Sequence, residues 1–222
     1  MKQSTVDLSR LRPRERILET AARLFYESGV RSVGIDRILE ESGAAKASFY
    51  RHFPSKDALV EAYLRQRHER WMSWFSARLL ALCAERGYAL RRLADALGEW
   101  FREPDFRGCA FINATAEGAL APGSISVVQA HKVDLKSEIE ALATYLGHPS
   151  PPATGAHALL VIEGAIVRAQ MTGNAGEADN AAHLLDLLDS VPRKPHQRRS
   201  SKSSKQVSAL VRDHDRKTVR PG

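Results

Sequence analysis

The sequence of 222 residues predicts an all-α fold. Apolar residues recur at intervals of three and four along most of the chain, which is the spacing of one buried helical face. Glycine or proline stands near the expected helix ends, where these residues favour termination. No segment shows the apolar–polar alternation that indicates a β-strand, and no internal repeat is present.

The first helix is expected over residues 13–28. Pro13 suits the first turn of a helix, and Gly29 suits its exit. Its apolar stripe consists of Ile17, Ala21, Leu24 and Phe25. Residues 1–12, which precede this helix, are expected to form a flexible basic arm.

Residues 34–57 are expected to form two short helices joined by a tight turn. The first carries a buried-face pattern at Ile35, Ile38 and Leu39. Gly43 follows it, where a helix C-terminus favours a left-handed residue. The second, over about 45–52, ends before Pro54, because proline disfavours helix in the residue preceding it. Two helices around a glycine turn match the helix-turn-helix motif, whose second helix enters the DNA major groove. An ordinary helical hairpin with a polar face is the alternative.

The chain resembles the DNA-binding domain of the TetR family of bacterial transcriptional regulators. The matching stretches are RERILETAARLFYESGV (14–30), IDRILEESG (35–43) and KASFYRHFPSKDALV (46–60). This close resemblance covers roughly a fifth of the chain, and the rest matches the family only in helix number and length. The family usually has Ser or Thr capping both helices of the motif, but this chain has Gly34 and Ala45. Alanine at such a position loses about 1 kcal/mol of cap stabilisation. It also lacks the hydroxyl with which Ser or Thr could contact a phosphate.

The resemblance implies DNA contacts on the second helix of the motif and at the start of the next helix. Tyr50 and Lys56 would contact phosphates, the latter supported by a helix N-terminus. Lys46, Ser48, Arg51 and Arg37 are the candidates for reading bases. The complete set of expected DNA-binding residues is Arg37, Lys46, Ser48, Tyr50, Arg51, His52 and Lys56.

The next helix is unusually long. It opens with Ser55 as a cap and an acid, Asp57, in its first turn, and its apolar pattern continues to Leu82. Such a helix joins the DNA-binding part to the rest of the chain without a flexible linker. Further helices are expected over about 90–101, 108–118, 128–146, 153–172 and 177–191. The expected domains are an arm (1–12), a helix-turn-helix domain (13–58), a helical effector-binding and dimerisation domain (59–192) and a disordered basic tail (193–222).

The last two helices are expected to form a dimer interface. Residues 153–172 are apolar nearly all round, and 177–191 carry a leucine stripe. A helix that is apolar on every side must be covered on every side, so two helices from each subunit would form a four-helix interface. The expected interface residues are Leu159, Ile162, Ile166, Leu184, Leu185 and Leu188.

Two histidines on apolar helix faces suggest a small-molecule site, since such sites are apolar with a few polar groups. A core histidine with its hydrogen bonds satisfied is the alternative. The polar residues nearby would, if buried, need a hydrogen-bond partner, which either a ligand or a neighbouring helix could supply. The expected ligand-binding residues are His68, Trp71, Phe75, Trp100, Phe111, Asn113, Glu117 and His131.

The net charge of +7 is divided unevenly along the chain. Residues 1–60 contain 11 basic and 8 acidic residues, 61–192 contain 12 and 16, and 193–222 contain 10 and 2. The acidic middle is not expected to contact nucleic acid. The tail is expected either to be silent or to approach phosphates beside the operator. With two cysteines, no apolar signal core and no long apolar run, a cytoplasmic protein without a membrane span is expected.

No nucleophile–base pair, phosphate loop or metal-ligand motif is present, so neither an enzyme nor a cofactor is expected. Asp179, His183 and Asp186 share a helix face, and a hydrogen-bond cluster is favoured over a metal site. Cys109 would be either an inert buried thiol or a sensor of electrophiles. The interpretation is a homodimeric regulator of a palindromic operator in double-stranded DNA, a repressor released by a small-molecule effector. The alternative is a DNA-binding protein whose body only dimerises.

Overall fold

The computed structural model describes residues 8–118 and 120–191. Over these residues the chain forms nine α-helices after one short 3-10 helix, and no strand, so the all-α prediction is confirmed. The bounds are η1 Leu8–Arg10, α1 Pro13–Ser28, α2 Ile35–Ser42, α3 Lys46–His52, α4 Lys56–Arg86, α5 Arg91–Phe101, α6 Ala110–Ala116, α7 Pro122–Tyr145, α8 Pro151–Thr172 and α9 Glu177–Asp189. The expected basic tail and most of the expected arm lie outside the described residues.

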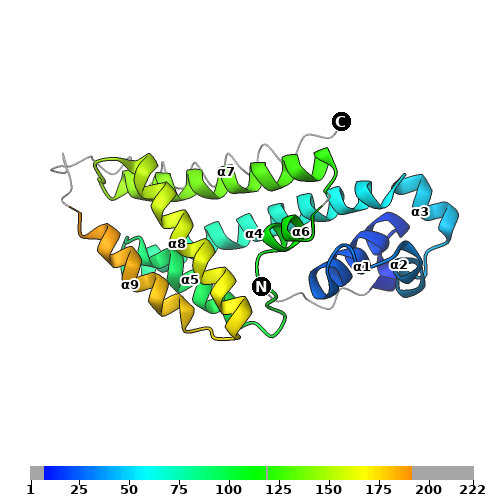
Figure 1. Cartoon of the computed structure of the whole chain (residues 1–222), viewed down its shortest axis with the longest axis horizontal. Helices are drawn as coiled ribbons and strands as arrows, with labels where there is room; N and C mark the ends of the chain where they lie inside the picture. Colours follow the sequence, from blue (N-terminus) through cyan, green and yellow to red (C-terminus); the bar gives the residue numbers. More distant parts are fainter. Residues whose placement is uncertain (1–7, 119, 192–222) are drawn as a thin grey trace.

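Helices α1, α2 and α3 form a small bundle at one end of the molecule, which we call the head (Figure 1). Its centre contains apolar side chains from all three helices, and Leu24, Ile38 and Phe49 are completely buried. Phe53, which follows α3, is also buried. The apolar side chains of the three helices therefore meet in one core.

Local signals set the helix ends of the head. Gly43 has φ 62°, the left-handed conformation that was expected after α2. Ser55 caps α4, because its hydroxyl accepts a hydrogen bond from the Ala58 N–H at 3.1 Å. The two unusual caps, Gly34 before α2 and Ala45 before α3, supply no side-chain hydrogen bond. The head thus relies on its apolar core rather than on capping at these two positions.

Helix α4 connects the head to the remaining helices, α5–α9, which together with α4 we call the body (Figure 1). Its 31 residues extend for about 46 Å. In the body, α4 packs on α5 and α7, α7 on α8, α8 on α9, and α5 on α9. One apolar core runs through head and body, and Tyr63 and Leu64 of α4 are buried within it.

The long, apolar α8 is buried on only one side. Ala158, Ile162 and Ile166 point into the subunit, whereas Leu160 and Met171 are exposed to solvent. Among the described residues, no helix has the length and apolarity needed to cross a membrane. The outer side of α8 thus presents apolar side chains to solvent.

Candidate functional site

The outer face of α3 presents polar side chains around one buried aromatic residue. Phe49 anchors the helix in the head, while Lys46, Tyr50 and Arg51 are exposed. The Tyr50 ring packs edge-on against Phe49, with centroids 5.2 Å apart. This contact holds the Tyr50 ring against the anchored part of α3, so its hydroxyl lies at the surface.

The remaining expected DNA contacts fall into two groups. Ser48, His52 and Lys56 are partly exposed and lie on α3 or at the start of α4. Arg37 lies on α2, where its Nε is 2.9 Å from Glu41 Oε1. Arg23 binds the same carboxylate, and the two guanidinium groups hold the pKa of Glu41 below its usual range. A base contact by Arg37 would therefore compete with an existing ion pair.

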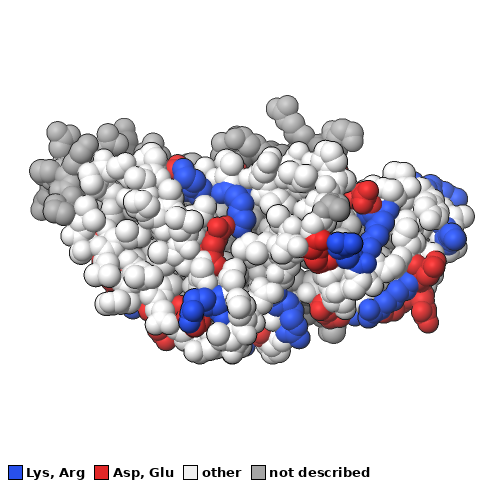
Figure 2. Space-filling view, in the orientation of Figure 1, with Lys and Arg blue, Asp and Glu red and all other residues white. Residues whose placement is uncertain are grey.

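Charge is concentrated at the head end of the face in Figure 2. Lys and Arg side chains gather there among Asp and Glu, and further charged side chains lie along α8, whereas the far end of this face, beside α9, is mainly uncharged (Figures 1 and 2). On this face, therefore, charge is densest over the head.

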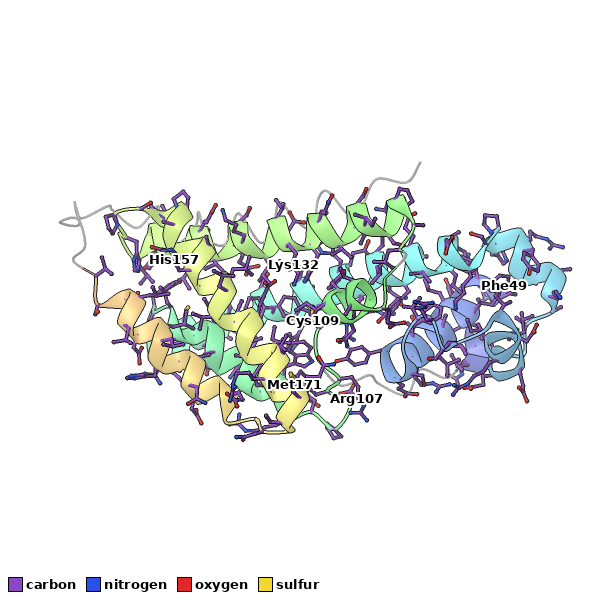
Figure 3. The ribbon with its side chains drawn as sticks, in the orientation of Figure 1. Phe49, Arg107, Cys109, Lys132, His157 and Met171 are labelled. Atoms are coloured by element: carbon purple, nitrogen blue, oxygen red, sulfur yellow. The ribbon has the colours of Figure 1, made fainter. Side chains whose placement is uncertain are left out.

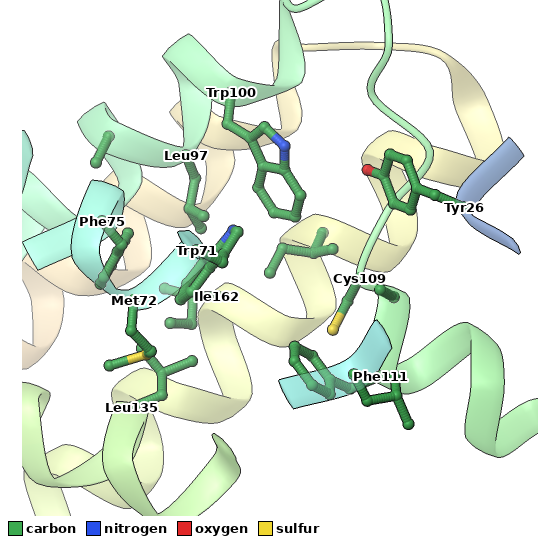
Figure 4. Packing of buried hydrophobic residues seen from close by; sticks show 14 of the residues in the cluster. Tyr26, Trp71, Met72, Phe75, Leu97, Trp100, Cys109, Phe111, Leu135 and Ile162 are labelled. Atoms are coloured by element: carbon green, nitrogen blue, oxygen red, sulfur yellow. The ribbon is translucent and has the colours of Figure 1, made fainter. Parts of the chain in front are cut away.

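A small cavity lies in the body between α4, α5, α6, α7 and α8, where aromatic side chains converge (Figure 4). Trp71 stacks on Phe75 at 4.7 Å and meets the edge of Trp100 at 5.7 Å, measured between ring centroids. The volume of the cavity is about 10 Å³, which is enough room for a single water molecule. The lining residues are Arg67, Trp71, Trp100, Cys109, Ala110, Phe111, His131, Lys132, Leu135, Glu163 and Ile166.

The two histidines meet each other beside this cavity. His68 Nδ1 lies 3.2 Å from His131 Nδ1, and His68 Nε2 lies 3.5 Å from Asp134. The His131 ring also stacks on Phe111, with centroids 3.8 Å apart. Burial lowers the pKa of His131 to about 2, and Lys132 adds to this effect, so the ring is neutral. These contacts are those of a hydrogen-bonded core histidine that also forms part of a cavity wall.

The expected ligand-binding residues are thus divided by the structure. Trp71, Trp100, Phe111 and His131 line the cavity, and Phe75 and His68 pack behind Trp71 and His131. Asn113 and Glu117 lie elsewhere, in a groove between head and body. Arg67 also lines the cavity, although it was not among the residues predicted from the sequence. Its spacing could have indicated this position, because Arg67 stands three residues after Leu64 and four before Trp71, within the apolar stripe.

Several polar groups are buried around the cavity. Arg67 is only 7% exposed, and its guanidinium lies 4.1 Å from the centre of the Tyr26 ring. The indole N–H of Trp71 is buried and has no hydrogen-bond partner. Lys132 Nζ and Glu163 Oε1 are 2.6 Å apart, so these two charges compensate each other.

Head and body meet at a groove of about 510 Å³. On one side of it, the Tyr26 hydroxyl donates to the Gly108 carbonyl at 3.0 Å and accepts from the Arg107 N–H at 2.9 Å. On the other, the Glu117 carboxylate accepts hydrogen bonds from the Val30 and Arg31 N–H groups, at 3.0 and 2.6 Å. We call these two sets of contacts the head–body junction. They connect both ends of α6 to the head.

The hydrogen-bond partners of Asn113 in the structure are protein groups. Its side-chain amide donates to the Arg107 carbonyl at 2.8 Å and accepts from Gln170 at 3.0 Å. Asn113 thus ties α6 to the preceding loop and to α8. Asn113 and Glu117, both predicted to bind a ligand, therefore lie at the groove and do not line the cavity.

Cys109 precedes α6 and is 6% exposed (Figure 3). The Lys132 Nζ lies 3.8 Å from its sulfur. The other cysteine, Cys83, is buried in α4, and burial raises its pKa to about 11. In the described part of the chain, no group of three or more His, Cys, Asp and Glu side chains is arranged to hold a metal. Asp186, considered for a metal-like cluster, instead pairs with Arg91 at 2.5 Å.

The expected dimer surface includes side chains that already belong to the subunit core. Ile162, Ile166 and Leu185 are buried within one subunit and are not available to a partner. Leu184 is exposed, and Leu159 and Leu188 are partly exposed. The exposed apolar side chains that α8 and α9 do offer are Leu160, Met171, Leu184 and Leu187 (Figure 3 labels Met171). Burial separates the two sets because adjacent residues of an α-helix point about 100° apart around its axis, so one can face the core while the next faces solvent.

Residues 17–63, which include α2, α3 and the start of α4, match the family model described as bacterial regulatory proteins, tetR family. Over the whole fold, the chain is similar to the crystal structure of SCO4454, a TetR-family transcriptional regulator from Streptomyces coelicolor. The TM-score is 0.69 and the identity 32%, covering 80% of this chain and 94% of that one. The reduced form of E. coli NemR has the same fold, with a TM-score of 0.64 and 19% identity over 80% of this chain and 97% of that one.

Curated relatives are similar over about a quarter of the chain. The chain is 45% identical over 62 residues to the HTH-type transcriptional regulator LmrA of Bacillus subtilis, covering 24% of this chain and 33% of LmrA. It is 38% identical over 56 residues to the uncharacterized HTH-type transcriptional regulator Rv1255c of Mycobacterium tuberculosis, covering 25% and 28%. The matched segments thus span about a third or less of these proteins.

Proposed function

Because this chain belongs to the TetR family of transcriptional regulators and is a DNA-binding regulator, not an enzyme, we propose that it acts as a cytoplasmic homodimeric repressor. In this proposal two copies of the head occupy successive major grooves of a palindromic operator. A small molecule bound in the body then releases the protein from DNA.

The exposed polar face of α3 is the observation that carries the DNA-binding part of the proposal. Lys46, Tyr50 and Arg51 surround an aromatic anchor, so they are presented on a rigid helix. We assign Tyr50 and Lys56 to phosphates, because a hydroxyl and an ammonium at a helix N-terminus suit them. Lys46 and Arg51 are assigned to base edges. Ser48, His52 and Arg37 complete the surface.

The head–body junction supports control by a ligand. Both ends of α6 are bonded to the head, at Tyr26 and at the turn after α1, while α6 also forms one wall of the cavity. A ligand that enlarges the cavity and moves α6 must strain or break these hydrogen bonds. It must bind the DNA-incompetent arrangement more tightly by about 1–3 kcal/mol to give useful coupling.

The exposed side of α8 and α9 supports the dimer. Leu160 and Met171 on α8, and Leu184 and Leu187 on α9, lie at spacings that place each pair on one side of its helix. Gly164, between the two α8 residues, has open space where a side chain would stand, so a partner helix can approach closely. Together these residues form a continuous surface for an isologous contact.

Footprinting on the DNA that flanks the protein's own gene, followed by affinity measurements on the protected site, tests the proposal. Tyr50→Phe removes only the hydroxyl and should weaken binding of every sequence alike, by about threefold to tenfold. Lys46→Ala should weaken binding and also reduce the preference for operator over unrelated DNA.

Lys136→Ala is the matched control, since this lysine lies on α7 in the body and pairs with Glu140. It should leave operator affinity unchanged. Equal affinities for the wild type, Tyr50→Phe and Lys46→Ala, all folded as judged by circular dichroism, would remove α3 as the recognition helix.

The small volume of the cavity favours a second candidate, in which the body only dimerises. About 10 Å³ holds no organic effector without movement of the walls. The two candidates differ in one observable. Only the ligand-controlled repressor loses operator affinity when a compound that binds the free protein is added.

A further inference from the structure

We propose that the effector is a small aromatic carboxylate, held through its anionic group by Arg67 and by the indole N–H of Trp71. This assignment rests on the proposed control by a ligand and adds the chemical class of that ligand. Figure 4 shows the site from within the body, with Trp71, Trp100, Cys109 and Phe111 around the same space.

Arg67 supplies the positive charge. It is 7% exposed and lines the cavity, yet no carboxylate of the described residues lies within ion-pairing distance of it. Its guanidinium lies over the face of the Tyr26 ring, 4.1 Å from the ring centre. A buried guanidinium without an anion is costly, because transfer out of water is repaid only by a paired charge and hydrogen bonds. A carboxylate entering the cavity would supply both.

Trp71 supplies a second donor. Its indole N–H is buried without a hydrogen-bond partner, although buried tryptophans usually find one. Trp71 follows Arg67 by four residues on α4, so the two side chains lie one above the other on the same helix face. Both are donors only, and both line the same cavity. An acceptor, and above all an anion, is the group that satisfies them together.

The other charged groups of the cavity do not cancel this preference. Lys132 and Glu163 neutralise each other at 2.6 Å, and His131 is uncharged because burial lowers its pKa to about 2. The remaining walls are apolar or aromatic, from α5, α6, α7 and α8. They fit the flat apolar body of an aromatic acid, with the charge directed toward α4.

Binding requires the cavity to enlarge, and the structure indicates which wall yields. Helix α6 has seven residues and is bounded by Gly108 and Gly118, with φ of 78° and 74°. The Gly108 carbonyl is also the acceptor of the Tyr26 hydroxyl. A carboxylate that draws Arg67 from the Tyr26 ring therefore acts on the same residue that bonds the head to the α6 side of the body.

The test measures binding to the full chain in the absence of DNA. Benzoate, phenylacetate, 3-phenylpropionate and 2-naphthoate are each compared with their primary amides by calorimetry and by thermal unfolding at pH 7.5. At least one carboxylate should bind tenfold or more tightly than its amide. Arg67→Met, which keeps most of the side-chain volume, should weaken that carboxylate about 10- to 100-fold and leave the amide unaffected.

Trp71→Phe keeps an aromatic wall and removes only the N–H, so it should weaken the carboxylate about threefold to tenfold. Arg65→Met is the matched control, because Arg65 lies on the same helix but is exposed and paired with Glu61. The proposal is overturned by any of three results: no carboxylate binds the wild type, acids and amides bind alike, or Arg67→Met and Trp71→Phe both bind the acid as the wild type does.

Operator release is measured separately with the carboxylate that binds. If the acid binds through Arg67 but leaves the operator occupied, the anion site stands and the ligand-released repressor fails. If an uncharged or cationic compound releases the operator instead, ligand control stands and the anion site fails.

Discussion

Head and body differ in what they bury. The buried polar side chains of the head, Thr20 and Ser42, carry no charge, whereas in the described part of the body Arg67, His131, His148 and Glu177 are buried. The head places its charges outside, where a nucleic acid can meet them. The body instead encloses polar groups, among which Arg67 lines the cavity and Glu177 pairs with Arg168. The proposed DNA-binding surface of the head is therefore external, whereas the proposed ligand site of the body is internal.

The most disruptive test of this contrast removes a core phenylalanine from each part. Phe49→Ala and Phe75→Ala each delete a completely buried ring and should each cost about 3–5 kcal/mol. Phe49→Ala should abolish operator binding and raise amide hydrogen exchange in α1–α3 only. Phe75→Ala should raise exchange in α4 and its neighbours in the body.

Hydrogen exchange by mass spectrometry distinguishes the two patterns. A uniform rise over the whole chain in both variants would contradict the division, and would show that the shared apolar core unfolds as one cooperative unit.

A second test addresses the exposed leucines of α9. Leu184→Glu with Leu187→Glu places two charges on exposed positions of α9 and should yield monomers. Operator affinity should fall about 100-fold or more, because the two half-sites are no longer bound together. Val133→Glu, another exposed apolar position but on α7, is the control for added charge. Sedimentation that finds the double variant still dimeric would place the interface elsewhere.

A third test weakens the bonds between the two parts. Tyr26→Phe removes the hydrogen bonds to Arg107 and Gly108, and Glu117→Gln weakens those to Val30 and Arg31. Each should lower the free energy of unfolding by about 1–2 kcal/mol. Each should also reduce the change in operator affinity caused by a bound effector, measured as the ratio of dissociation constants with and without it. An unchanged ratio in both variants would exclude the junction as the coupling route.

The last test concerns a buried acid of the body. Glu138 on α7 accepts a hydrogen bond from Ser76 at 2.6 Å, and burial raises its pKa to about 7 from an ordinary value of 4.5. Between these values the folded state keeps a proton that the unfolded chain releases. The free energy of unfolding therefore falls as the pH rises from about 4.5 to about 7, and levels off above it.

Glu138→Gln removes this dependence. Relative to the wild type, the variant should gain about 2 kcal/mol of stability between pH 5 and pH 8, measured by urea unfolding at both values. Glu69→Gln, an exposed acid on α4, is the control for the loss of one charge. A wild type whose stability relative to Glu138→Gln is equal at pH 5 and pH 8 would contradict the assignment.

The head could be predicted from the sequence because its signals are local. Pro13, Gly43 and Pro54 fix helix ends by their own backbone preferences, and the apolar spacing places Phe49 inside. The body could be predicted only to the level of its helices. That Ile162 faces inward and Leu160 outward depends on where α5 and α9 lie, which no single helix encodes. Likewise, Glu117 meets Val30 across 87 positions of sequence, beyond any local pattern.

The unbroken length of α4 has a geometric consequence for operator recognition. A rigid rod of about 46 Å that pivots by about 5° at one end moves its other end by about 4 Å. Successive base pairs are about 3.4 Å apart along the DNA axis. An angular adjustment too small to repack most side chains in the body is thus enough to shift a recognition helix out of register by a full base pair.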